Sequence, residues 1–170
     1  MSQNVFPLIT LSMTGGGVAL LLAAGAHDIA ARLVSNRAAL ALALCGVALR
    51  GADGTLGLAL AGAGAVFLAA AFCWRRGWLG GGDVKLLGAA ALFVAPRQIP
   101  ALLLAVALAG GALALLYLAL AALPPPAPAG GAKARLIPRV LRAERWRIRR
   151  RGPLPYASAI AVGTVFTLFR

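Results

Sequence analysis

Two acidic residues, Asp28 and Asp83, are the side chains in this sequence best suited to chemistry. Only four Asp and Glu residues occur among 170, and these two lie at ends of apolar runs without a local reason to be there. An ionisable group at a membrane border is costly, so it marks a candidate functional site. The other two have local explanations: Asp53 lies in a Gly-rich turn, and Glu144 lies among arginines as a neutralised surface residue.

A pair of carboxylates can hydrolyse a peptide bond without a metal ion. Two like charges a few ångströms apart cannot both ionise cheaply, so the pair shares one proton. The ionised partner acts as base on a water molecule, and the protonated partner donates to the carbonyl oxygen. Asp83 precedes an expected helix, whose positive end favours the ionised form, as would the Lys85 ammonium if it turns back. Asp28 ends its apolar run, so we expect it to hold the proton.

The residues before Asp83 offer room for a substrate. Gly80, Gly81 and Gly82 have no side chains that would block an extended peptide lying against the backbone. Three glycines alone are equally typical of a flexible loop. Glycines that end at an acid and lead through Lys85 into an apolar run are a more specific pattern.

The composition places these acids in a membrane protein. Hydrophobic residues make up 61% of the chain, the mean hydropathy is +0.88, and 12% of the residues are charged. A soluble fold of this size cannot bury so much apolar surface, and disordered chains contain far less of it. We therefore expect a polytopic membrane protein rather than a soluble enzyme.

Six apolar runs are the expected membrane crossings, and they predict an all-α bundle of six transmembrane helices. The runs are 6–26, 38–49, 56–74, 86–95, 101–123 and 154–169. The runs 38–49 and 86–95 are short for a bilayer. The first run also resembles a cleaved signal peptide, but the residues 1–4 lack the basic charge of such a leader. Two crossings separate Asp28 from Asp83, so both acids are expected at the same membrane face.

Small residues within the runs are expected where helices approach each other closely in lipid. They recur at helical spacing as Gly57, Ala61 and Gly64 in one run, and as Gly110 and Ala114 in another. Cys45 and Cys73 also lie inside apolar runs and form no CxxC pair, so they are interpreted as packing residues. Neither a disulfide framework nor a metal site is expected.

The basic residues predict the orientation of the chain. Lys and Arg number 17 against four acids, a net charge of +13. With the N-terminus outside, 14 of the 17 fall in the inner segments 27–37, 75–85 and 124–153, which predicts an N-out, C-out topology. We expect one domain over 1–170, in which 124–153 is a cytosolic Pro/Gly linker followed by a basic segment.

The basic segment has two readings that the sequence leaves open. Arginines recur every three or four residues over 133–151, which is typical of an amphipathic helix lying on anionic lipids of the inner leaflet. A retention signal for topology fits equally well. Nucleic-acid binding is not expected, because no aromatic platform or known motif accompanies the charge.

The motif around Asp83 resembles the type IV prepilin peptidases, which are membrane aspartyl proteases of the GxGD class. The eight residues from Gly80 to Leu87 match the family's GxGDxKLL core at every defined position. The family's upstream spacing of an aspartate, a basic residue four later and an asparagine eight later is held by Asp28, Arg32 and Asn36. Val34 and Ser35 replace the usual Ile-Pro, and 154–163 resembles the last helix of the short Tad/Flp-pilus branch.

This resemblance implies a specific activity. Such enzymes cut the basic leader from prepilins or pseudopilins at the cytosolic face of the bacterial inner membrane, just before the pilin's hydrophobic segment. Asp28 and Asp83 would be the catalytic pair, without cofactor or metal. Gly80, Gly81, Gly82, Lys85, Arg32 and Asn36 would bind substrate or support the site. Larger members also methylate the new N-terminus through a domain with CxxC pairs; this chain has none, so cleavage without methylation is expected.

Other readings stay open at this point. A non-enzymatic carrier or channel could use Asp28, Asp83 and Lys85 as an ion relay. A presenilin-like intramembrane protease shares the GxGD element, but that class has tyrosine before its first aspartate, where this chain has His27. His27 is expected at the membrane interface. Arg32 could hold acidic groups of the substrate, although a role as a topology anchor is favoured.

Overall fold

Six helices of more than ten residues make up the part of the fold that the structure describes. The computed structural model describes residues 5–123, 144–148, 150 and 153–170. In chain order the helices are α1 (Val5–Ala31), α2 (Asn36–Ala52), α3 (Leu56–Arg75), α4 (Gly81–Phe93), α5 (Ile99–Ala122) and α7 (Tyr156–Leu168), with a 3₁₀ turn η1 (Pro96–Gln98) before α5. Each corresponds to one of the apolar runs, so the described part of the chain is all-helical as predicted.

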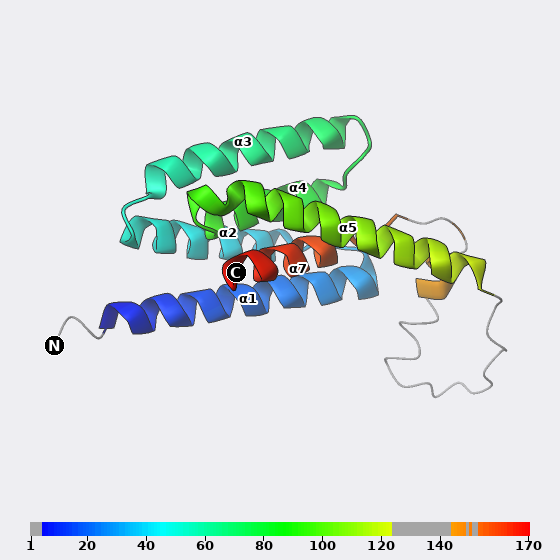
Figure 1. Cartoon of the computed structure of the whole chain (residues 1–170), viewed down its shortest axis with the longest axis horizontal. Helices are drawn as coiled ribbons and strands as arrows, with labels where there is room; N and C mark the ends of the chain where they lie inside the picture. Colours follow the sequence, from blue (N-terminus) through cyan, green and yellow to red (C-terminus); the bar gives the residue numbers. More distant parts are fainter. Residues whose placement is uncertain (1–4, 124–143, 149, 151–152) are drawn as a thin grey trace.

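The helices run back and forth, and this brings particular helix ends together. Figure 1 shows that the ends of α1, α3 and α5 and the beginnings of α2, α4 and α7 lie at one end of the bundle. That end therefore carries both Asp28 and Asp83. The predicted linker and most of the basic segment lie outside the described residues; within the latter, 144–148 forms a short helical stretch beside the end of α1.

α4 forms the centre of the bundle. Its residues from Leu86 to Phe93 are all buried, between α2 and α3 on its flanks and α7 behind. The approach to α2 is close, because a Cβ atom added at Gly46 would lie 2.9 Å from the Leu92 carbonyl carbon. Side chains would hold these two backbones apart, so a glycine at position 46 is what permits their packing.

The last helix, α7, packs between α1 and α5 through small residues. A Cβ added at Gly163 would lie 2.7 Å from the Val106 backbone nitrogen, and one added at Gly25 would lie 3.1 Å from the Ser158 Cα. Gly110 packs against the ring of Tyr156, which confirms that glycine as a contact residue. The expectation was wrong for Gly57 and Gly64, since a Cβ added to either meets nothing within 4 Å.

Among the described residues, three stretches are long and apolar enough to cross a membrane. They are Thr10–Ala31, Leu56–Arg75 and Pro96–Ala122, and Tyr156–Leu168 is a shorter apolar helix. At 1.5 Å per residue the 13 residues of α4 extend only about 20 Å, against a hydrocarbon core of about 30 Å. α4 is instead covered by its neighbours along most of its length.

Candidate active site

Asp28 is buried against the beginning of the last helix. It lies in the final turn of α1 with 6% of its surface exposed. One carboxylate oxygen accepts a hydrogen bond of 3.2 Å from the backbone N–H of Ala157, the second residue of α7. A helix N-terminus presents unpaired N–H groups and a partial positive charge, and both stabilise a carboxylate. The sequence motifs gave no sign of this contact, which joins residues 129 positions apart.

Asp83 lies in the first turn of α4, half-buried, with its side chain folded back along the helix start. Its carboxylate accepts a hydrogen bond from the Gly80 backbone N–H and is close enough to Asp28 for the two charges to interact. The Tyr156 phenol, at the beginning of α7, lies within electrostatic range of the same carboxylate. Three helix ends thus bring two acids and one phenol within electrostatic range of each other, and both acids lie at the same end of the bundle, as the run count predicted.

The glycines before Asp83 differ in what surrounds them. A Cβ added at Gly80 would lie 2.7 Å from the Asp83 Oδ2, and one added at Gly82 would lie 2.9 Å from the Val34 Cβ. Gly81 is less constrained, since its nearest neighbour would be the Trp74 Nε1 at 3.4 Å. The first and third glycines therefore make room for the catalytic candidate and for the α1–α2 connection.

Glu144 is buried, and the expectation of a surface residue was wrong. It is 6% exposed and forms ion pairs with Arg32 at 2.6 Å and with Arg147 at 2.7 Å, so its neutralisation by arginine is confirmed. Tyr117 of α5 donates a further hydrogen bond of 2.7 Å. Burial alone would raise the pKa of Glu144, but hydrogen bonds from Tyr117, Arg147 and Arg32 outweigh it and lower the pKa.

Arg32 and Arg147 fasten this cluster to the end of α1. Arg32 follows α1 in the left-handed conformation, with φ of 57°, and its side chain also donates to the Pro153 carbonyl. Arg147 donates to the carbonyls of Ile29 and Ala30 at 3.1 and 3.3 Å, which are unpaired acceptors in the last turn of the helix. The structure thus ties the segment before α7 to the helix that carries Asp28.

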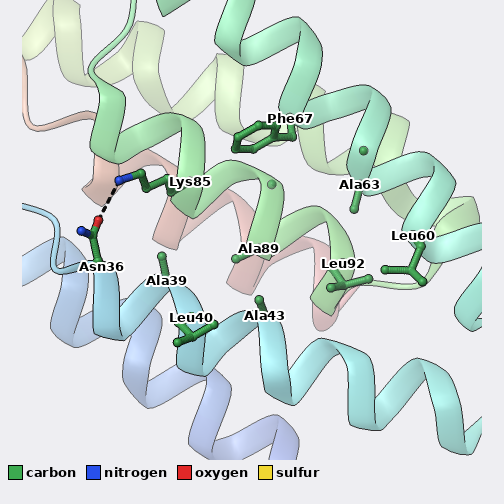
Figure 2. A pocket seen from close by; sticks show the side chains of 12 residues that line it. Asn36, Ala39, Leu40, Ala43, Leu60, Ala63, Phe67, Lys85, Ala89 and Leu92 are labelled. Atoms are coloured by element: carbon green, nitrogen blue, oxygen red, sulfur yellow. Dashed lines mark hydrogen bonds between the residues drawn. The ribbon is translucent and has the colours of Figure 1, made fainter.

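Lys85 and Asn36 form a separate polar pair on the other side of α4. The Lys85 ammonium donates a hydrogen bond of 2.9 Å to the Asn36 Oδ1, as Figure 2 shows, so it points to α2 and is not turned back on Asp83. Asn36 begins α2, where the hydroxyl of the preceding Ser35 accepts from the Arg37 backbone N–H at 3.2 Å. Ser35 therefore acts as an N-cap where the prepilin peptidases usually have proline.

A sequence model of the type IV leader peptidase family matches residues 16–115. This stretch is more than half of the chain and includes both Asp28 and Asp83. The chain belongs to that family. It is accordingly a membrane-associated protease that acts on type IV leader sequences. No match was found among curated proteins or among solved structures.

Two cavities of this leader peptidase border α4. One of about 590 Å³ lies between α2, α3 and α4, with Lys85 and Asn36 at its polar end. The other, of about 330 Å³, lies among α3, α4, α5 and α7 and is bounded by Tyr156, Trp78 and Cys73. Both have mostly apolar linings, which suits a substrate that is itself membrane-embedded.

The single histidine and the two cysteines of the leader peptidase lie in the helices that build the bundle. His27 is exposed, and its Nδ1 lies 2.8 Å from the Leu33 carbonyl at the turn after α1. Cys45 and Cys73 are free thiols in α2 and α3. Within the described ranges no three His, Cys, Asp or Glu residues gather as metal ligands would.

Proposed function

We propose that this protein is an aspartyl endopeptidase that removes the leader of Flp-type prepilins at the cytosolic membrane face, without methylating the product. The observation that supports the proposal is that Asp28 and Asp83, two of only four acids and 55 residues apart in the sequence, lie at one end of the helix bundle of a leader peptidase within electrostatic range of each other. Nearby acids in a low-dielectric site share a proton, and this is the state that acid-catalysed amide hydrolysis needs.

The reaction uses the two carboxylates in opposite roles. The ionised one takes a proton from water as the water oxygen attacks the scissile carbonyl carbon, while the protonated one donates its proton to the carbonyl oxygen. Collapse of the resulting diol breaks the C–N bond: the leaving nitrogen takes a proton from the carboxyl that received it, and the other carboxylate takes a proton from a diol hydroxyl as the new carbonyl forms. One water is consumed, and the aspartate pair ends with the single proton with which it began.

The two acids are held in similar ways. Asp28 accepts from the N–H of Ala157 at the beginning of α7, and Asp83 accepts from that of Gly80 at the beginning of α4. The expectation that Asp28 holds the proton considered only the partial negative charge at the C-terminal end of α1, where Asp28 lies. Because α7 brings a positive helix end to Asp28 as well, helix-end electrostatics favour neither acid.

We propose six crossings with both termini outside, in which the short α4 crosses enclosed by α2, α3 and α7 and not in contact with lipid, so that the site end faces the cytosol of a bacterial inner membrane. Support comes from the side chains at that end, where Arg37, Arg75 and Arg76 are exposed next to the exposed indoles of Trp74 and Trp78. Basic residues favour the cytosolic side, and tryptophans favour the interface. The arginines of 133–151 would extend this surface over anionic lipids.

Cleavage without methylation is supported by the cysteines. Cys45 and Cys73 lie on different helices, and the sequence contains no CxxC pair of the kind found in the methylating members. The assignment to the Flp branch is supported by the resemblance of residues 154–163, most of which lie in α7, to the last helix of that branch.

The decisive experiment is co-expression with a Flp-type prepilin, whose shortening is followed by gel and by mass spectrometry. We expect Asp28→Asn and Asp83→Asn each to abolish cleavage. Asp53→Asn is the matched control, because Asp53 bonds Thr55 and Arg50 in the α2–α3 turn at the opposite end of the bundle, and it should cleave normally. Cleavage that survives in either of the first two variants would reject the shared-proton mechanism and favour an ion relay.

A further inference from the structure

A groove between α2, α3 and α4 leads away from the acids along the bundle. Its volume is about 590 Å³, and α4 lies between the two helices that wall it (Figure 2). Lys85 stands at the site end, two residues beyond Asp83, and Leu92 lies two turns along the same face of α4. The groove therefore begins at the end of α4 that carries Asp83, on the side of the helix opposite that acid.

The shape of the groove suits a helix. Apart from Lys85 and Asn36, its lining is apolar, and half of the lining residues are small: Ala39, Ala43, Ala63, Gly64, Gly88 and Ala89. Small residues let a helix backbone approach closely in lipid, whereas a flexible acyl chain gains nothing particular from them. A Cβ added at Gly64 meets nothing within 4 Å, so the space beside α3 is open.

The charge at the site end of the groove indicates what the occupant carries. Lys85 is exposed, and the partner that the structure gives its ammonium is the neutral amide oxygen of Asn36 at 2.9 Å. The ion pairs among the described residues join Glu144 to two arginines and Asp53 to Arg50, and Lys85 is in none of them. A carboxylate at this end of an apolar occupant would complement the ammonium.

We infer that this groove seats the apolar helix of the substrate, with a carboxylate near the cytosolic end of that helix bound by Lys85. The inference rests on the proposed function and adds to it a docking surface separate from the reacting atoms. A helix held along α4 from Lys85 onward would leave the chain preceding it at the level of Asp83. The groove thus sets which peptide bond reaches the acids.

The first test fills the groove. In purified enzyme in vesicles acting on a Flp-type prepilin, Gly64→Leu should raise KM about tenfold and leave kcat within about twofold, because it removes binding and spares the acids. Gly111→Leu is the matched control: this α5 glycine also meets nothing within 4 Å, lies outside the groove and should leave both constants unchanged. Equal kinetics for the two variants would overturn the inference.

The second test asks what Lys85 binds. The prepilin chosen for this test is one with Asp or Glu in the first two turns of its apolar segment, and it is compared with a variant in which these are changed to Asn or Gln. Lys85→Gln and the substrate variant should each reduce kcat/KM about tenfold, and the combination should be no worse than either alone, as for one charge-assisted bond. Lys85→Arg should retain most activity.

The remaining outcomes of these two tests would overturn either the docking surface or the proposed function. Additive losses would mean that Lys85 does not meet the substrate's acid and would overturn the inference. Additivity together with a Lys85 effect that grows with the phosphatidylglycerol content of the vesicles would assign the groove to a lipid instead. If wild type cleaves and the groove variants match it, only the docking surface fails; if wild type does not cleave the prepilin at all, the proposed function fails first.

Discussion

Gly80→Ala tests how Gly80, three residues before Asp83, positions the Asp83 carboxylate. Gly80 has φ −76° and ψ 146°, an extended conformation that alanine adopts freely, so the backbone is not strained. The new Cβ would lie 2.7 Å from the Asp83 Oδ2, and ordinary contact begins at 3.4 Å, so the carboxylate must move by about 0.7 Å. A displacement of that order at a reacting group costs on the order of 10²-fold in rate.

The stability of the protein should hardly change in this variant. A carboxylate can rotate away at a cost of about 1 kcal/mol, whereas the catalytic geometry cannot follow. We therefore expect kcat/KM for prepilin cleavage to fall about 100-fold while the melting temperature in detergent stays near that of wild type. Gly81→Ala is the matched control, because its Cβ would meet only Trp74 at an ordinary 3.4 Å. Equal rates for the two variants would refute the reasoning.

Three further predictions concern stability. Gly163→Ala should cost about 2 kcal/mol by pressing on the Val106 backbone, whereas Gly111→Ala should be neutral or slightly stabilising; thermal unfolding in detergent compares them. Glu144→Gln should cost about 2 to 3 kcal/mol, because it leaves the Arg32 charge without its counter-ion, and a melting temperature equal to wild type would contradict this. The lowered pKa of Glu144 makes this loss of stability depend on pH. The contribution of the ionised Glu144 to the free energy of unfolding is complete above the ordinary pKa of 4.5 and is lost as the pH falls through the lower pKa of the folded state. The melting temperatures of wild type and Glu144→Gln should therefore converge in acid.

The arrangement of the acids was predictable because it depends on little more than counting. Apolar runs and polar breaks locate the helices, and an even number of crossings between Asp28 and Asp83 returns the chain to the same end. The purpose of the glycines was not predictable in the same way. That they admit a peptide stays a prediction, and the structure adds that Gly80 makes room for the Asp83 carboxylate and Gly82 for Val34.

Contacts between residues far apart in the sequence could not be predicted from motifs or from periodicity. The arginines next to Glu144 in the sequence are typical of a surface residue. In the structure, however, one of the partners of Glu144 is Arg32, which lies 112 residues away. The bond from Ala157 to Asp28 uses a backbone N–H, which every residue except proline carries and which no motif marks. Both contacts depend on the packing of α7 and the segment before it against α1, and hydrophobic periodicity does not predict which helices pack together.

The burial of α4 has a consequence for how the enzyme responds to its bilayer. Helices that face lipid tilt or shift when hydrocarbon thickness changes. α4 is enclosed by α2, α3 and α7 over Leu86–Phe93, so protein neighbours and not the surrounding lipid fix its height. Asp28 is likewise fastened to the beginning of α7. The spacing of the two carboxylates should therefore stay constant from thin to thick membranes, while the depth of the whole pair below the headgroups changes.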